Sequence, residues 1–313
     1  MERLLFAVLL LFTTCTTGQS SSETTESEAV QAEFETNIID ASASTSSTIE
    51  FGPCTEFIGG YYVPEANARI VVPEKYTLDV SEEGAVVAQV RAINCQSISI
   101  KYEDGSTEEG GEHILYQLGA AVLSPVQLDP NPLLVGAAEI TEYHAYAYNT
   151  LTNFEPLAVA LEKAGIRGVH HVENLVFNTG DDNPNGCELV PVEGSVSTPA
   201  ELALSFSGLV RDLGLEPEDG CQMGPNDVTV SERAVWYTEG ELGTVISDTA
   251  VPNKQILLFN ADPTTYEPLP VTFSPTGEKM QLIGGGLEQF SFTMSGLLER
   301  GEVFTTLRLV TEE

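Results

Sequence analysis

The residues of this chain best suited to acid–base chemistry are histidines that stand close to glutamates. His171 and Glu173 are two apart in one segment, and Glu142 and His144 are two apart in another. Residues two apart in a β-strand share a face, so each pair would place an imidazole beside a carboxylate. Such a pair can act as a general base or form part of a metal site. We therefore take His171 and Glu173 as candidate catalytic residues.

The same alternation also predicts a pocket wall. His144 and Tyr146 share a strand face, and His171 falls on a strand that we expect beside it. We predict that these three residues bind a small ligand. The alternatives left open are that the histidines are ordinary strand residues, exposed or satisfied in the core, and that the tyrosines pack across strands.

The segments that carry these residues are predicted to form a strand, a helix and a second strand. Alternation from Ile140 to Tyr148 predicts the first strand. Thr152 or Asn153 can cap the helix that follows, and Gly165 fits its end. The second strand is expected at residues 169–177.

A polar loop follows that begins like a calcium loop. Asp181, Asn183 and Asn185, followed by Gly186, place alternate oxygens as such a loop requires. The twelfth position, where a bidentate glutamate is expected, is Val192. The loop is therefore either a calcium site or a polar turn between strands, and no other cofactor is predicted.

The cysteines indicate an oxidising compartment. Cys54, Cys95, Cys187 and Cys221 form an even set beyond the leader, which indicates two disulfides. The sequence allows three pairings. We favour Cys54 with Cys95 and Cys187 with Cys221, because each pair falls within one local run of strands.

The beginning of the chain is typical of an exported protein. An apolar run, Leu4–Phe12, follows a basic residue and precedes small polar residues, as in a secretory signal peptide. The run is too short to span a bilayer, and no transmembrane segment is predicted. Residues 1–18 would be removed, or 1–14 if Cys15 is acylated as in a lipoprotein. We expect an extracytoplasmic protein, either secreted or lipid-anchored at the cell envelope.

Composition divides the remainder of the chain into two parts. Residues 19–48 are rich in Ser, Thr and Glu with few large apolar side chains, which predicts a disordered tether. Residues 49–313 are long enough for a single β-rich domain. The chain has 47 acidic and 13 basic residues, a net charge of −34. Such a charge repels phosphate backbones, so nucleic acid is excluded as a partner.

Period-two segments with turn residues between them continue to the end of the chain. Residues 198–213 fit either a helix or a strand, and we favour a helix from Leu209 onward. The pattern predicts an α+β fold, mainly antiparallel β, with one or two helices. Further strands are expected at residues 57–63, 68–72, 76–80, 85–93, 227–238, 255–259, 286–294 and 303–310.

The order of these segments resembles the acetoacetate decarboxylase-like superfamily. The resemblance lies in residues 63–78, VPEANARIVVPEKYTL, in the strand at 84–90, and in the strand and helix of 139–165. It implies a conical or barrel-like closed sheet around an internal pocket. Those decarboxylases use a Schiff-base lysine. At the matching stretch this chain has His170 and His171 and no lysine.

We therefore predict an exported binding protein that holds a small apolar or amphipathic molecule in a β-cone pocket, without decarboxylase activity. The alternative is an enzyme that acts on a carbonyl or carboxylate substrate with a His/Glu general base. A third possibility is a structural surface protein without a ligand. The sequence leaves the oligomeric state open.

Overall fold

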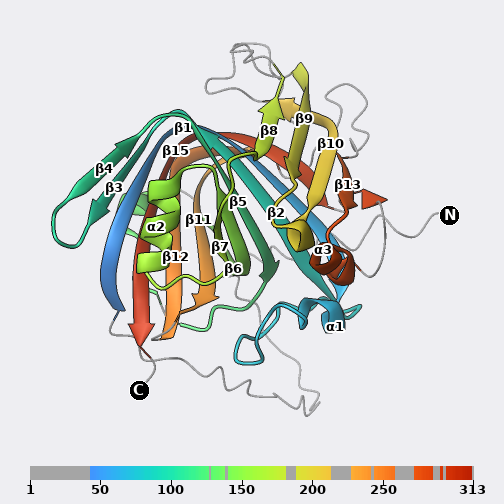
Figure 1. Cartoon of the computed structure of the whole chain (residues 1–313), viewed down its shortest axis with the longest axis horizontal. Coiled ribbons are helices and arrows are strands. Elements are labelled where there is room, and N and C mark those ends of the chain that lie inside the picture. Colours follow the sequence, from blue (N-terminus) through green and yellow to red (C-terminus); the bar gives the residue numbers. More distant parts are fainter. Residues whose placement is uncertain are drawn as a thin grey trace, which may run out of the picture. The chain divides into compact units, whose positions relative to one another are not determined.

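The computed structural model describes residues 43–126, 128–137, 140–180, 188–212, 227–240, 243–257, 271–284, 290–291 and 294–311. Its main element is a closed sheet in which β15 pairs with β1 (Figure 1). The seven strands of the ring are, in order, β1 (Ala43–Pro64), β2 (Ala85–Cys95), β5 (His113–Ala121), β6 (Ile140–Thr152), β11 (Asp227–Glu239), β12 (Gly243–Leu257) and β15 (Met294–Thr311). The unit Met1–Thr36, with the predicted leader and Cys15, lies outside the described residues.

The ring is mainly antiparallel, as predicted. Its exception is β6, which runs parallel to β11 and to the short strand β7 (Val169–His171). A parallel neighbour needs a crossover connection, and helix α2 (Glu155–Lys163) provides it between β6 and β7. The predicted strand, helix and strand are thus present, and Gly165 has the left-handed φ of 90° expected at the helix end.

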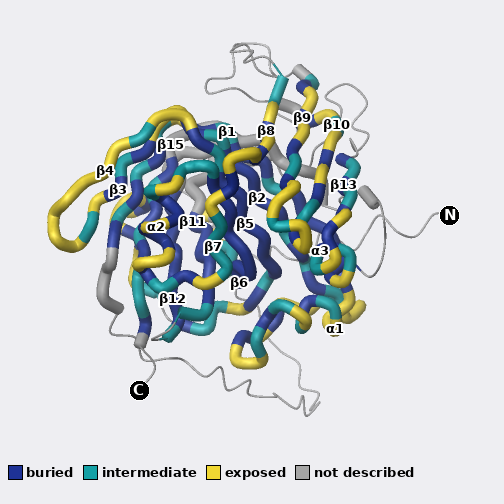
Figure 2. Tube along the Cα trace, in the orientation of Figure 1, coloured by how far each residue is buried: buried dark blue, intermediate teal, exposed yellow. Residues whose placement is uncertain are grey.

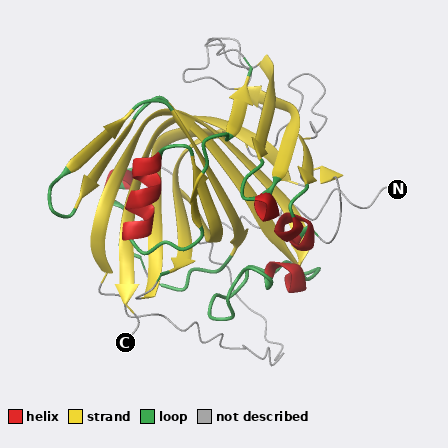
Figure 3. Ribbon diagram, in the orientation of Figure 1, coloured by secondary structure: helices red, strands yellow, loops and turns green. Residues whose placement is uncertain are grey.

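A hairpin and a second sheet complete the β structure, and the helices are short (Figure 3). The hairpin, β3 (Ile98–Tyr102) and β4 (Thr107–Gly110), extends the ring from β1. The second sheet has the order β14 (Phe290–Ser291), β13 (Val271–Pro275), β10 (Leu204–Asp212), β9 (Glu188–Val196) and β8 (Val176–Thr179). The remaining helical elements are α1 (Glu65–Ala68), α3 (Glu278–Ile283) and the 3₁₀ turns η2 (Pro132–Leu134) and η3 (Ala200–Leu202).

The interior of the ring is filled by side chains. All seven strands contribute residues to the lining of a cavity of about 30 Å³, which Leu157 and Leu161 of α2 also line. This volume holds one or two water molecules and no ligand of the predicted size. Arg91 ion-pairs there with Glu56 and donates to Gln117 Oε1 at 2.6 Å, and all three side chains are buried.

The opposite face of the strands builds the larger apolar core. Phe57 stacks on Phe206 of β10, and Tyr61 stacks on Phe273 of β13, so the second sheet packs against the outside of the ring. Figure 2 shows the ring strands largely buried, and β4 and the turn that joins it to β3 largely exposed. Within the described residues no helix is long and apolar enough to cross a membrane.

The structure corrects several sequence-based expectations. β1 begins at Ala43, six residues before the predicted start of the domain at residue 49. Residues 169–177 form parts of two strands in different sheets, because the chain leaves β6 after His171. The helix favoured from Leu209 onward was wrong. That segment belongs to strand β10, which pairs on both sides with β9 and β13.

The disulfide predicted between Cys54 and Cys95 is confirmed. The two residues face each other across β1 and β2, with an S–S distance of 2.10 Å. Cys187 and Cys221 lie outside the described residues.

Candidate functional site

A lysine amine, an amide and an imidazole meet where α3 approaches β6 and β7. Lys279 Nζ donates to Asn149 Oδ1 at 2.7 Å, and Asn149 Nδ2 donates to His170 Nε2 at 3.0 Å. Asn149 Nδ2 also donates to the carbonyl of Gly168 at 3.2 Å. Because Nε2 of His170 accepts, the neutral ring carries its proton on Nδ1. We call Lys279, Asn149, His170 and Tyr148 the amine site.

A β-bulge in β6 lets the neighbouring residues Tyr148 and Asn149 both contact Lys279. Leu118 of β5 pairs with Asn149, but the next residue, Gly119, pairs with Ala147, so Tyr148 is the extra residue. A bulge of this kind redirects side chains out of strict alternation. The amine of Lys279 therefore lies 5.2 Å from the centre of the Tyr148 ring while it also reaches the Asn149 amide.

Burial makes the charged forms of this site unfavourable. Desolvation lowers the pKa of the Lys279 amine, and the carboxylate of Glu201 opposes that shift to a smaller extent. Desolvation likewise lowers the pKa of His170, against the carboxylates of Glu201 and Glu162. Among the described residues, no carboxylate lies within ion-pair distance of Lys279 Nζ. The site thus holds an amine with an increased neutral fraction beside a neutral imidazole.

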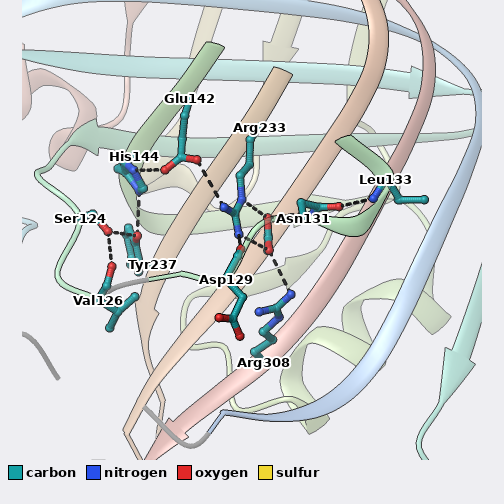
Figure 4. A network of polar contacts seen from close by, with 11 residues as sticks. Ser124, Val126, Asp129, Asn131, Leu133, Glu142, His144, Arg233, Tyr237 and Arg308 are labelled. Carbon is teal, nitrogen blue, oxygen red and sulfur yellow. Dashed lines mark hydrogen bonds and ion pairs between the residues drawn. The ribbon is translucent and has the colours of Figure 1, made fainter. Parts of the chain in front are cut away.

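A second polar cluster surrounds His144 of β6 (Figure 4). His144 Nε2 lies 2.9 Å from Glu142 Oε1, and Nδ1 lies 2.8 Å from the hydroxyl of Tyr237. That hydroxyl is 3.0 Å from Ser124 Oγ, which donates to the carbonyl of Val126 at 2.7 Å. We call this chain of four contacts the hydroxyl chain.

An arginine pair adjoins the hydroxyl chain. Arg233 binds both oxygens of Asp248 at 2.9 Å and reaches Glu142 at 3.4 Å. Arg308 contacts the same aspartate at 3.2 Å. The Asp248 side chain is fully buried, so two arginines compensate a carboxylate that would otherwise be strongly destabilising.

The structure does not bring the sequence-predicted site residues together. His171 pairs with Thr152, eight residues along β6 from His144, and both His171 and Glu173 are exposed. Tyr146 is buried against Tyr76, with ring centres 4.8 Å apart. Neither His144, Tyr146 nor His171 lines the cavity inside the ring. That these residues bind a ligand stays a prediction.

Of the two histidine–glutamate pairs that the sequence offers, the structure shows a contact in one. The imidazole in contact with a carboxylate is His144, with Glu142, and not His171 with Glu173. Sequence reasoning missed the amine site, because Asn149 and Lys279 are 130 residues apart. Glu278 after Gly277 is a signal only for the start of the helix that carries Lys279, since acidic residues favour the first turn of a helix.

Groups of three or more His, Cys, Asp or Glu residues able to hold a metal are absent from the described part of the chain. The predicted calcium loop with Asp181, Asn183 and Asn185 falls outside it.

Comparison with known proteins adds a likeness of fold. No family model matches the chain, and no curated protein sequence matches it. An acetoacetate decarboxylase-like enzyme from Sphingomonas wittichii has a TM-score of 0.44 at 8% identity, covering 86% of this chain and 93% of that one. Acetoacetate decarboxylase from Legionella pneumophila has a TM-score of 0.43 at 10% identity, covering 86% and 88%. The enduracididine biosynthesis enzyme MppR has a TM-score of 0.40 at 9% identity, covering 85% and 88%. Each of these three similarities covers more than four fifths of both chains at a TM-score below 0.5.

Proposed function

We propose that this protein is an enzyme that acts on a carbonyl substrate, with Lys279 as its amine nucleophile and His170 as its proton donor and acceptor. This is the enzymatic alternative drawn from the sequence, with different residues in the leading roles. The observation that carries it is the environment of Lys279, a half-buried amine bound to a neutral amide and an aromatic ring.

The environment matters because only a neutral amine is a nucleophile. An exposed lysine is almost entirely protonated at neutral pH. Burial lowers the pKa of the Lys279 amine, so a larger fraction of it carries a free electron pair. Asn149 holds the amine in place without supplying the negative charge that would favour the ammonium form.

The chemistry balances with the residues present. The Lys279 nitrogen would attack the carbonyl carbon, and the carbonyl oxygen would leave as water to give an imine. One hydrogen of the amine would pass to this oxygen, and a second proton would reach it through His170, whose ring first takes that proton from solvent and is neutral again afterwards. The nitrogen keeps its other hydrogen, so the product is the protonated imine. The protonated imine would then withdraw electrons from an adjacent bond of the substrate.

Reductive trapping tests this proposal. The protein is incubated with acetone or with pyruvate and then with sodium borohydride, which converts an imine into a stable secondary amine. We expect one adduct per chain by intact mass and its location on Lys279 by peptide mapping. The rate of trapping should rise with pH and level off below the ordinary lysine pKa, because burial lowers the pKa of this amine.

Matched controls come from two other lysines. Lys75 lies 5.3 Å from the centre of the Tyr76 ring, and Lys163 lies 5.2 Å from that of Tyr102. Both are exposed, so they share the aromatic contact without the burial. Lys279→Arg should abolish trapping, while Lys75→Arg and Lys163→Arg should retain it. Adducts spread equally over the three lysines, or absent from Lys279, would contradict the proposal.

A further inference from the structure

The four contacts of the hydroxyl chain need more hydrogens than its residues supply when His144 is neutral. The four contacts join Glu142, His144, Tyr237, Ser124 and the carbonyl of Val126, at distances of 2.7 to 3.0 Å. Each contact needs one hydrogen. The ionised carboxylate at one end and the carbonyl at the other only accept.

Counting hydrogens separates the two states of the imidazole. The two hydroxyl groups supply one hydrogen each, and a neutral ring supplies one more, which makes three hydrogens for four contacts. An imidazolium ring supplies two, and all four contacts are then filled in a single direction. Nε2 donates to Glu142, Nδ1 donates to Tyr237, Tyr237 donates to Ser124, and Ser124 donates to Val126.

The bond lost on deprotonation is one made by Ser124. A neutral ring keeps its hydrogen on Nε2, because a bare nitrogen facing the Glu142 carboxylate would be repelled. Nδ1 then accepts from Tyr237. Ser124 has one hydrogen left for two acceptors, so it gives up either Tyr237 or the carbonyl of Val126.

Ser124 lies in the connection between β5 and β6, of which residues 122–126 and 128–137 are described. Among the described residues, three hydrogen bonds that involve side chains tie this connection to the ring. They are Ser124 with Tyr237, the Asp129 carbonyl with Arg233 Nη2 at 2.9 Å, and Asn131 with Asp248 at 3.3 Å. The proton of His144 decides whether Ser124 keeps both this contact and its bond to the Val126 carbonyl, whereas the other two contacts do not involve His144.

We infer that protonation of His144 completes the hydroxyl chain and tightens the β5–β6 connection onto the ring, so that this connection responds to pH. The charged groups that face His144 affect the pH at which its ring becomes protonated. Desolvation lowers the pKa of His144, and Arg233 of β11 lowers it further, whereas the carboxylates of Glu142 of β6 and Asp248 of β12 oppose this shift. The Glu142 side chain is 40% exposed and that of His144 16%, so solvent protons reach the chain from this end.

Hydrogen exchange measured by NMR tests the inference. The reporter is the amide of Leu123, which donates to the Thr77 carbonyl at 2.8 Å beside Ser124. After correction for intrinsic exchange, we expect its protection to rise roughly two- to tenfold as His144 becomes protonated, the effect of one hydrogen bond. The reference is the Thr150 amide of β6, which donates to the Gly168 carbonyl at 2.9 Å and does not belong to the hydroxyl chain.

Tyr237→Phe separates the inference from a general effect of pH. The variant removes the central hydroxyl and keeps the ring, so His144 should still titrate while Leu123 protection no longer follows it. Ser124→Ala, at a partly exposed residue, should do the same and covers the case in which Tyr237→Phe unfolds. His171→Asn, at an exposed histidine, should behave as the wild type. Constant Leu123 protection across the His144 titration, or an equal response in Tyr237→Phe or Ser124→Ala, would overturn the inference.

Discussion

The four histidines of this chain differ in exposure and in polar contacts, because different residues surround them. His171 is exposed, whereas His144 and His170 each touch a polar partner. His113 is almost completely buried, with its ring stacked on Phe51 and its Nδ1 at 3.0 Å from the Gly111 carbonyl. Its Nε2 has no hydrogen-bond partner in the described part of the chain.

This burial predicts that the fold loses stability in mild acid. Desolvation lowers the pKa of His113 in the folded state, so the unfolded chain binds a proton first, below a pKa of about 6.5. The free energy of unfolding should therefore fall as pH drops from 7.5 to 5.5. Urea unfolding at both values checks this, and His113→Phe should show a smaller loss. Equal losses in the two proteins would show that His113 has no part in it.

At the scale of elements, the position of Lys279 depends on how closely α3 approaches η3. Thr276 and Gly277 both donate to the carbonyl of Ala203, at 2.9 and 2.7 Å. A Cβ atom at Gly277 would lie 2.4 Å from the Glu201 carbonyl oxygen and 2.5 Å from the Ala203 nitrogen. Both are backbone atoms, so the helix would have to move.

Gly277→Ala should therefore disturb the amine site without touching its side chains. We expect a loss of roughly 1–3 kcal/mol in stability, as for an overpacked contact, and a clear drop in the rate of borohydride trapping at Lys279. Thr276→Ala, at the exposed preceding residue, is the control and should leave the trapping rate near the wild-type value. An unchanged trapping rate in Gly277→Ala would mean that the approach of α3 does not position the amine.

At the scale of the whole molecule, a buried ion pair joins three strands of the ring. Arg91 of β2 contacts Glu56 of β1 and Gln117 of β5, and its side chain is 2% exposed. Removing one member of a buried pair leaves an uncompensated charge, whereas replacing both members removes it.

Variants of this pair should accordingly be non-additive. Arg91→Met should lower the free energy of unfolding by roughly 3–5 kcal/mol, because the Glu56 carboxylate stays buried without its arginine. The double variant Arg91→Met with Glu56→Leu should recover most of that loss. Denaturant unfolding of both variants measures the difference, and a double variant as unstable as Arg91→Met would refute this account.

Local patterns were enough to predict much of the architecture. The alternation at 140–148, the helix that ends at Gly165 and the pairing of Cys54 with Cys95 all appear in the structure. Each depends on residues close in the chain or on two neighbouring strands. The segment at 204–212 was misread because apolar residues there fit both periods, and pairing with β9 and β13 decided in favour of the strand.

The sequence by itself determined a mainly antiparallel β protein with one or two helices, since these follow from periodicity and turn chemistry. It left three cysteine pairings open, and the structure shows the favoured one between Cys54 and Cys95. Only the tertiary structure decided which polar groups meet. Lys279 reaches Asn149 across 130 residues, and His144 reaches Tyr237 across 93. Such contacts depend on strand register, on the bulge at Tyr148 and on the packing of a six-residue helix. None of these leaves a periodic signal in the chain, because each results from the sum of many weak contacts between distant segments.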